Sequence, residues 1–210
     1  MPSSISNLNE RLQVCFLAAG FSRRFGSAKL LAPMPDGRQL IEHSLQPYLE
    51  LGLSPTVFLR ADDQALLTQI KHHPLPTILL EDVSEGLSVS VRAAAEYAQS
   101  KEHSFTLFAL ADMPYLRASA LENFLDAIDW QENSIFAPFS QEQGRLGNPA
   151  IFHRNYLTEF SKLHGDQGAR PILKTHSDNL RKIDSLDIGF YKDVDTKEDL
   201  TSGGPTGSEP

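Results

Sequence analysis

The chain has 210 residues, of which 40% are hydrophobic and 22% are charged, and its formal net charge is −8. This length and composition predict one globular domain with a full core and exclude an intrinsically disordered chain. The acidic balance argues against nucleic acid or an anionic membrane as a partner, because both need a basic face, but it permits an anionic small molecule in a locally basic pocket.

Short apolar runs alternate with stretches of helical periodicity along the chain. The apolar runs predict strands at 13–18, 55–60, 77–81, 105–111, 134–138, 149–152 and 180–184. The periodic stretches predict helices at 39–51, 62–72, 88–99, 117–130 and 154–163. This alternation indicates βαβ units and a single three-layer α/β domain, in which helices cover both faces of a mostly parallel, mixed sheet.

The domain is expected to span residues 1–201, and the tail at 202–210 is rich in Gly, Pro and Ser, which predicts disorder. None of the apolar runs approaches the length that crosses a bilayer, and the N-terminus lacks the pattern of a signal peptide. We therefore expect a cytoplasmic protein, and we expect it to be a monomer. Cys15, the one cysteine, lies inside the first apolar run and is expected to be a buried thiol.

The first predicted strand leads into a loop that combines glycines with cations. Glycines let backbone N–H groups approach an anion closely, and cations neutralise it, so a nucleoside triphosphate is the simplest guest. The spacing excludes a Walker A loop, because no Ser or Thr follows the lysine, and it lacks the third glycine of a dinucleotide fingerprint. A solvated surface turn is the remaining alternative. The glycines and cations are Gly20, Arg23, Arg24, Gly26 and Lys29.

Polar residues also stand where later strands end or later helices begin. These positions are candidates for a site, because the active sites of parallel sheets lie beyond the carboxyl ends of the strands. Each position also has a local alternative. Ser88 suits the cap of the helix that follows it, and Asp112 suits a turn or a cap. Asp195 or Thr196 suits the cap of a closing helix.

Residues 17–31 fill every fixed position of the pattern Leu-Ala-Ala-Gly-x-Ser-x-Arg-[Met/Phe]-Gly-x-x-Lys-Leu-Leu. This pattern resembles that of the molybdenum cofactor cytidylyltransferases, a branch of the MobA-like NTP transferase superfamily. The related guanylyltransferases usually read Ala-Gly-Gly, with Asp before the lysine. The resemblance implies a Rossmann-like nucleotidyltransferase domain. It also implies nucleotide contacts from Leu17, Ala18, Ala19, Gly20, Ser22, Arg23, Arg24, Gly26 and Lys29.

Three later motifs resemble other parts of the same family. Gly86, Ser88 and Ser90 lie in a segment similar to the loop that enters a helix near the nucleotide base. Asp112 matches the Asp of an Asp-x-Pro motif whose carboxylate holds Mg²⁺ in the family, and Asp195 would supply a second metal-side carboxylate. The chemistry suits this cation, because Mg²⁺ is usually bound by one or two carboxylates together with substrate phosphates.

Two further segments, 144–152 and 165–170, resemble motifs that the family places around its second substrate, a phosphorylated pterin. One position departs from the family pattern, since Asn148 stands where the usual residue is His. An asparagine keeps a donor and an acceptor but does not become cationic near neutral pH, so the identity of the acceptor stays open. The implied acceptor contacts are Asn148, Asp166 and Arg170, with Arg145 as a further cationic candidate.

The reaction implied by the resemblance is the Mg²⁺-dependent transfer of CMP from CTP to the terminal phosphate of molybdenum-loaded molybdopterin, with release of pyrophosphate. The attacking phosphate monoester is largely dianionic at pH 7, since its second pKa is about 6, so the protein need not supply a general base. Catalysis would rest on alignment and charge neutralisation by Arg24, Lys29 and Asp112. The resemblance also implies a transient hand-off of product to a molybdenum hydroxylase.

Three alternatives stay open. A transferase of the same fold could use GTP or another phosphorylated acceptor, and an NAD(P)H-dependent oxidoreductase could use this scaffold. The third alternative is a nucleotide-binding module without catalysis. A histidine metal site is not supported, because the seven histidines show no ligand spacing with Cys or carboxylates.

Overall fold

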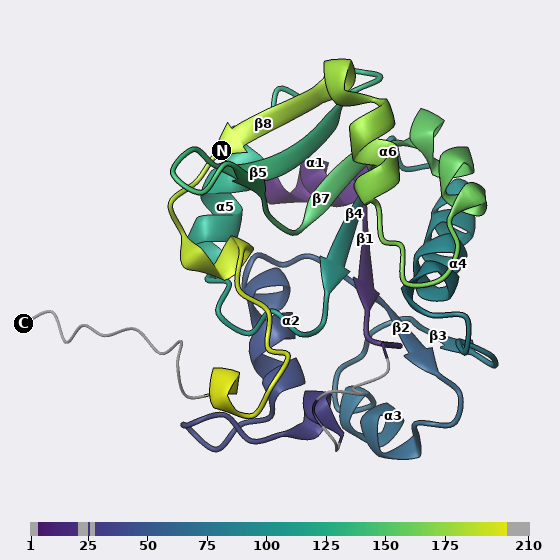
Figure 1. Cartoon of the computed structure of the whole chain (residues 1–210), viewed down its shortest axis with the longest axis vertical. Coiled ribbons are helices and arrows are strands. Elements are labelled where there is room, and N and C mark those ends of the chain that lie inside the picture. Colours follow the sequence, from purple (N-terminus) through teal and green to yellow (C-terminus); the bar gives the residue numbers. More distant parts are fainter. Residues whose placement is uncertain (1–3, 21–24, 26–27, 201–210) are drawn as a thin grey trace, which may run out of the picture.

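The computed structural model describes residues 4–20, 25 and 28–200, and it shows a layered α/β domain (Figure 1). The predicted tail at 202–210 lies outside the described residues. Within the described part, an eight-stranded sheet has the order β3-β2-β1-β4-β7-β5-β6, and β8 pairs with β5. None of the helices formed by these residues is both long and apolar enough to cross a membrane.

All seven predicted strands are present, with ends shifted by a residue or two. Strand β6 was not predicted, because a two-residue strand leaves no periodic pattern. The strands are β1 (Leu12–Leu17), β2 (Thr56–Arg60), β3 (Thr77–Leu80), β4 (Phe105–Leu110), β5 (Ile135–Ser140), β6 (Arg145–Leu146), β7 (Ala150–His153) and β8 (Leu180–Asp184).

The sheet is mixed and mostly parallel, as predicted. Strands β3, β2, β1 and β4 are parallel, whereas β7 is antiparallel to both β4 and β5, and β8 is parallel to β5. Leu17 pairs with Phe58 and Leu110, so β2, β1 and β4 reach the same edge together. The loops that follow β1 and β4 therefore leave the sheet side by side.

Four of the five predicted helices are α-helices, but the fifth is not. The stretch expected as a helix at 154–163 is the 3₁₀ helix η2 (Arg154–Lys162). Its buried residues Tyr156, Leu157 and Phe160 fit either helical period, so the pattern does not separate the two forms. The confirmed helices are α2 (Leu40–Glu50), α3 (Gln64–Ile70), α4 (Leu87–Gln99) and α5 (Ala118–Asp126).

Two α-helices and several short 3₁₀ turns were not predicted. The predicted helix at 117–130 also ends early, at Asp126, and the chain turns again at Trp130, whose φ is 48° and whose ring packs edge-on against Phe105. The additional helices are α1 (Ser4–Arg11), α6 (Arg170–Thr175), η1 (Lys29–Leu31), η3 (Ser177–Asn179), η4 (Ile188–Phe190) and η5 (Glu198–Leu200).

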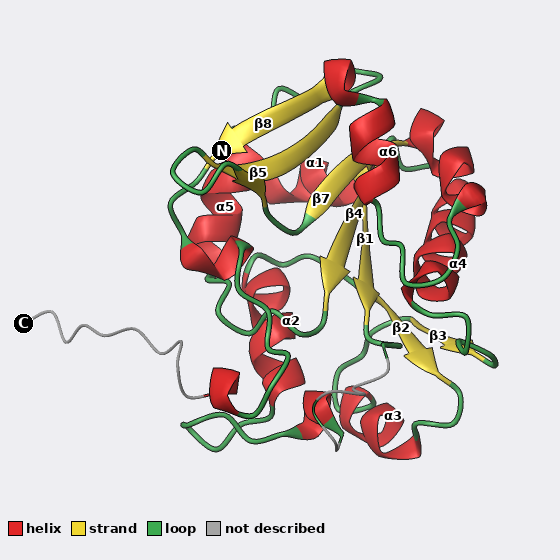
Figure 2. Ribbon diagram, viewed as in Figure 1, coloured by secondary structure: helices red, strands yellow, loops and turns green. Residues whose placement is uncertain are grey.

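Helices α2 and α5 lie on one side of the sheet and α4 lies on the other (Figure 2), and a hydrophobic core lies on each side. Phe16 faces the core under α2 and α5, whereas its neighbours Cys15 and Leu17 face the core under α4 and η2. Successive side chains of a strand point to opposite faces, so a wholly buried β1 serves both cores. The Cys15 thiol is buried, as predicted, and burial raises its pKa.

Candidate functional site

The edge where β1 and β4 end carries two of the predicted motifs. The Ala18 amide donates to Phe58 O over 2.9 Å, and the Ala111 amide donates to Leu17 O over 3.1 Å. These bonds extend the sheet ladder by one residue and bring Gly20 and Asp112 to the same edge. A Cβ at Gly20 would meet no atom of the described residues within 4 Å apart from its chain neighbours, so contacts with this part of the chain do not require the glycine.

The centre of the predicted anion loop is not described by the structure. Ser22, Arg23, Arg24 and Gly26 lie outside the described residues. The flanking predicted residues are described: Leu17, Ala18 and Ala19 are buried, and Gly20 is exposed.

Lys29 is buried and is the first residue of η1, at the end of the predicted anion loop. Its side chain contacts residues that lie much later in the sequence. Its Nζ donates to Asp112 Oδ2 over 2.8 Å and to Val194 O over 2.7 Å. The same nitrogen lies 3.8 Å from Asp195 Oδ1. The structure therefore brings three predicted site residues, from three separate motifs, into one cluster.

Three carboxylates form that cluster, and one of them was not among the predicted ligands. One oxygen from each of Asp112, Asp193 and Asp195 lies within 4.8 Å of the others. Between the last two, Val194 is fully buried, and its amide donates to Asp112 O over 2.9 Å. In an extended segment, residues two apart project to one side, so burial of Val194 turns both flanking aspartates toward Asp112. The Asp-x-Asp spacing was the sequence signal for Asp193.

The closing turn is held by a different carboxylate from the one predicted. Asp199 Oδ2 accepts from the amides of Asp195 and Thr196, over 3.0 and 2.7 Å, and from the Thr196 hydroxyl. The element that follows is the 3₁₀ helix η5 rather than an α-helix. Asp199 therefore reaches back to the turn, and the Asp195 side chain remains beside Lys29.

The charge balance of the cluster favours a cation. Partial desolvation and the neighbouring Asp112 carboxylate raise the pKa of Asp193 above its usual value. Among the residues that the structure describes, Lys29 supplies one positive charge beside Asp112 and Asp195. Hard oxygen donors are the ligands that Mg²⁺ and Mn²⁺ prefer, and an ion held at about 2.1 Å brings its ligands within about 4.2 Å of one another. Small side-chain shifts would therefore let these residues hold a divalent ion.

The predicted base loop enters α4, but its cap differs from the prediction. Gly86, with φ of +117°, is the N-cap of α4, so Ser88 is the second residue of the helix and does not cap it. The Ser88 hydroxyl is buried and has no hydrogen-bond partner in the described structure. The Ser90 hydroxyl is also buried, and it donates to Leu87 O over 3.0 Å.

Two of the predicted acceptor residues contact identifiable segments of the site. A Cβ on Gly86 would lie 2.3 Å from Asp166 Oδ1 and 2.8 Å from the Gly165 carbonyl, so Asp166 lies directly against the entry of α4. Asn148 lies beside the segment that leads to the aspartates, because its backbone amide donates to Phe190 O over 2.8 Å. The structure therefore brings Asp166 to the base loop.

The two cationic acceptor candidates, Arg145 and Arg170, differ in the contacts that their side chains make. The Arg145 guanidinium lies 5.5 Å from the ring centroid of Tyr191 and donates to the Tyr191 carbonyl. It is therefore committed to a structural contact. Arg170 begins α6 and is exposed, and its side chain makes no hydrogen bond or ion pair with the described residues.

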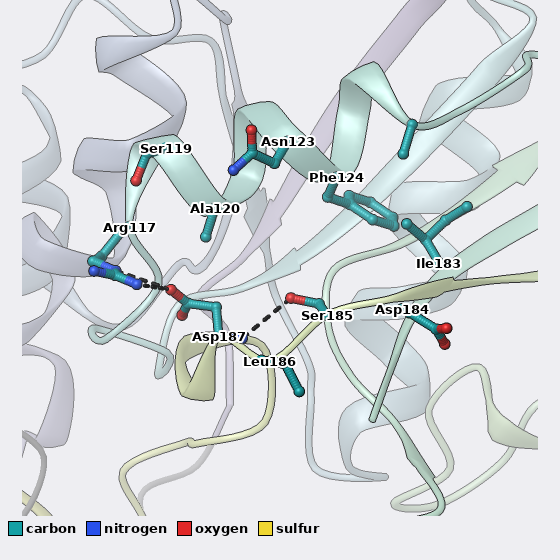
Figure 3. Close-up of a pocket in the computed structure, with 11 residues that line it drawn as sticks. Arg117, Ser119, Ala120, Asn123, Phe124, Ile183, Asp184, Ser185, Leu186 and Asp187 are labelled. Atoms are coloured by element: carbon teal, nitrogen blue, oxygen red, sulfur yellow. Dashed lines mark hydrogen bonds and ion pairs between the residues drawn. The ribbon is translucent and has the colours of Figure 1, made fainter. Parts of the chain in front are cut away.

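A separate pocket of about 450 Å³ lies between α5 and the segment that follows β8 (Figure 3). None of the predicted site residues lines it. The Arg117 guanidinium, at its mouth, donates twice to Asp187 Oδ2, over 2.9 and 2.5 Å. This pairing neutralises the cation, so the pocket offers no free positive charge to an anionic substrate.

Two proteins similar to this chain carry names that bear on its activity. "Purine catabolism protein PucB" from Bacillus subtilis is 28% identical over 193 residues, which are 88% of this chain and 91% of that protein. "Probable molybdenum cofactor guanylyltransferase" from Rhodopirellula baltica is 29% identical over 127 residues, which are 60% of this chain and 59% of that protein.

Solved structures show the same fold. A homologue of Rv0371c from Mycobacterium sp. strain JC1 is 25% identical, covers 91% of this chain and 94% of its own, and superposes with a TM-score of 0.76. Rv0371c from Mycobacterium tuberculosis H37Rv, in complex with manganese, is 21% identical with a TM-score of 0.68 over 90% of this chain and 95% of its own.

The family comparison covers most of the chain. The model of the MobA-like NTP transferase domain matches residues 14–180, which run from β1 to the first residue of β8. The match includes Lys29 and Asp112 and ends before Asp193 and Asp195. The chain therefore belongs to the family of MobA-like NTP transferase domains and is a nucleotidyltransferase.

Proposed function

We propose that this chain transfers CMP from CTP to the terminal phosphate of molybdenum-loaded molybdopterin and releases pyrophosphate. The observation that carries the proposal is the contact of Lys29 with Asp112 and Asp195 at the edge where β1 and β4 end. A phosphoryl-group transfer needs a cation and metal-binding carboxylates at one place, and these residues supply both.

The metal would be Mg²⁺, held by Asp112 and Asp195 with Asp193 as a third oxygen donor. When bound, it would neutralise the charge that develops on the nucleotide phosphates. Lys29 and Arg24 would bind the same phosphates and stabilise the leaving pyrophosphate. Among the described residues, Asp112 Oδ2 is already the partner of Lys29 Nζ, so the ammonium and a metal ion compete for this oxygen.

The nucleotide would lie between the anion loop and the entry of α4. Leu17, Ala18, Ala19 and Gly20 would contribute backbone to its phosphate side, with Ser22, Arg23 and Gly26. Gly86, Ser88 and Ser90 would face the base. The buried Ser88 hydroxyl supports this assignment, because a buried polar group without a partner is costly unless a ligand satisfies it.

The acceptor would bind through Asn148, Asp166 and Arg170. The exposed Arg170 guanidinium, which has no partner among the described residues, suits an anionic acceptor. We also propose that the product is handed transiently to a molybdenum hydroxylase.

GTP is the second candidate nucleotide, because a similar protein is named as a guanylyltransferase. The Ala18-Ala19-Gly20 opening and the Lys29-Leu30-Leu31 close support CTP instead. A screen of pyrophosphate release tests both: CTP, GTP, ATP and UTP are each supplied with molybdenum-loaded pterin and Mg²⁺. We expect CTP to react fastest. Faster release from GTP would overturn the choice of base, and oxidation of NAD(P)H without release from any nucleotide would overturn the transferase reaction.

A further inference from the structure

An ion pair outside the predicted site residues lies at the start of α4. The Glu85 carboxylate faces the Arg92 guanidinium, with 2.6 Å between Oε2 and Nη2 and 3.2 Å between Oε1 and Nη1. Such a two-point contact fixes the orientation of both groups as well as their distance. The pair spans the first two turns of α4, from the residue before its Gly86 cap.

Both members of the pair also hold a second segment. Arg92 Nη1 donates to Leu163 O over 2.6 Å, and Glu85 Oε1 accepts from the Gly165 amide over 3.3 Å. The Gly165 carbonyl in turn accepts from the Ser88 amide over 3.0 Å. The segment Leu163–Asp166 is therefore tied to α4 at three points.

The fit between the two segments leaves no room for a side chain. At Gly86, a Cβ would lie 2.3 Å from Asp166 Oδ1.

The Arg92 guanidinium lowers the pKa of Glu85 to about 2, and the Gly165 amide adds to this effect. Glu85 therefore stays ionised, and the contacts persist, throughout the neutral pH range.

We propose that Glu85 and Arg92 are positioning residues that hold Asp166 against the entry of α4 and so align the two substrates of the transfer. This inference rests on the proposed function, in which Ser88 contacts the nucleotide and Asp166 contacts the acceptor. Neither Glu85 nor Arg92 need touch a substrate, because each acts through the Leu163–Asp166 segment.

Misalignment of two bound substrates lowers the rate of transfer more than it weakens the binding of either one. We call the Glu85–Arg92 ion pair, with its bonds to the Leu163–Asp166 segment, the clamp. Loss of the clamp should therefore lower kcat and leave the dissociation constant of the nucleotide almost unchanged. A merely structural role would instead lower the thermal midpoint and the folded fraction. These two outcomes separate the positioning role from general stability.

The test compares Arg92→Met with Arg117→Met. Arg117 makes a similar two-bond contact, to Asp187, and touches none of the predicted site residues. We expect Arg92→Met to lower kcat per folded molecule about tenfold or more, with nucleotide affinity within about twofold. Both variants should melt within about 5 °C of the parent chain, because each pair has one member exposed to solvent, Glu85 or Arg117, and ion pairs that water screens contribute little to stability. The control should retain the parent kcat.

Hydrogen exchange tests the clamp without reference to activity. The Gly165 amide should exchange faster in Arg92→Met and in Glu85→Gln than in the parent chain, and Arg92→Lys should restore it only in part, since lysine lacks the two-point contact. Unchanged exchange at Gly165, or an unchanged kcat in Arg92→Met, would overturn the inference. An inactive parent chain would overturn the proposed function instead, and the exchange experiment would still decide the clamp.

Discussion

Lys29 is the residue on which most of the site depends. Its ammonium is buried against Asp112, Val194 and Asp195, so it neutralises carboxylates that would otherwise repel one another. The same carboxylates are the proposed metal ligands. A cation that occupies a metal-binding oxygen weakens metal binding, whereas a cation beside the phosphates accelerates transfer. Lys29 thus has two effects of opposite sign, which can be measured separately.

Replacing Lys29 by methionine should therefore lower turnover and raise metal affinity. We expect kcat to fall on the order of a hundredfold or more, similar to the loss of other charge-stabilising groups. Titration with Mn²⁺ in the absence of nucleotide should show tighter binding than in the parent chain. Lys71→Met, at an exposed lysine, is the matched control and should change neither quantity. Weaker Mn²⁺ binding in Lys29→Met would contradict the competition between ammonium and metal.

Loss of Asp112 should have the opposite effect on metal affinity but the same effect on turnover. Asp112→Ala should leave the fold intact, weaken Mn²⁺ binding and lower turnover on the order of a hundredfold or more. Asp193→Ala should weaken Mn²⁺ binding less, because the more exposed Asp193 is only a third donor. Asp126→Ala, at an exposed position on α5, is the control. Unchanged nucleotidyl transfer by folded Asp112→Ala protein would exclude Asp112 as a metal ligand.

The entry of α4 is the element where local conformation and the site meet. Gly86 has φ of +117° and ψ of −160°, a region that is essentially restricted to glycine. Its missing side chain also makes room for Gly165 and Asp166. The periodic pattern predicted this helix, and Ser88 was a candidate for its cap because serine is a common cap. Glycine is the cap because the close contact with Gly165 and Asp166 leaves no room for a side chain at residue 86. Local sequence preference does not encode a contact with so distant a segment.

Gly86→Ala should therefore destabilise the protein more than an alanine at an uncrowded glycine. Gly144 is the control: its φ is +61° and a Cβ there would meet no atom within 4 Å, so alanine incurs only the backbone cost. We expect about 1–2 kcal/mol for Gly144→Ala and more than about 3 kcal/mol for Gly86→Ala, where strain and a steric clash combine. Urea unfolding measures both. Equal losses would show that Asp166 moves away from α4 without cost.

The whole molecule is organised by a sheet that separates two cores. Phe16 contributes to one core and Phe108 to the other, through β1 and β4, which pair along their full length. Because neighbouring residues of β1 serve both cores, damage to either core is transmitted to the shared strands. We therefore propose that residues 1–201 form one cooperative domain.

Phe16→Ala and Phe108→Ala should each lower the free energy of unfolding by about 3–5 kcal/mol, since each removes a buried aromatic ring. Both should keep a single unfolding transition, with fluorescence and circular dichroism midpoints that coincide. Leu79→Ala, at an exposed leucine of β3, is the control and should cost far less. Separate transitions in either core variant would contradict one cooperative domain.

Periodic patterns in the sequence were sufficient to locate every strand of four or more residues and four of the α-helices. They did not locate α1, whose only large apolar residues are Ile5 and Leu8, nor the short α6 or the two-residue β6, and they did not distinguish the 3₁₀ helix η2 from an α-helix. The reason is physical: a hydrophobic period needs several turns or alternations to show itself. The motif at residues 17–31 identified the family on the same local basis, because its residues are contiguous.

Only the tertiary structure decided which motifs share a site. Lys29 and Asp112 are 83 positions apart, and they meet because β1 and β4 pair in register and end at one edge. Asp193 lies beside the other two carboxylates because the buried Val194 directs both of its neighbours toward Asp112. Asp166 lies at the base loop because Gly86 has no side chain to keep it away. Sequence by itself determined most of the strands, four of the α-helices and the MobA-like family, since these rest on local order. The site depends on contacts between distant segments, which only packing of the sheet and its loops brings about.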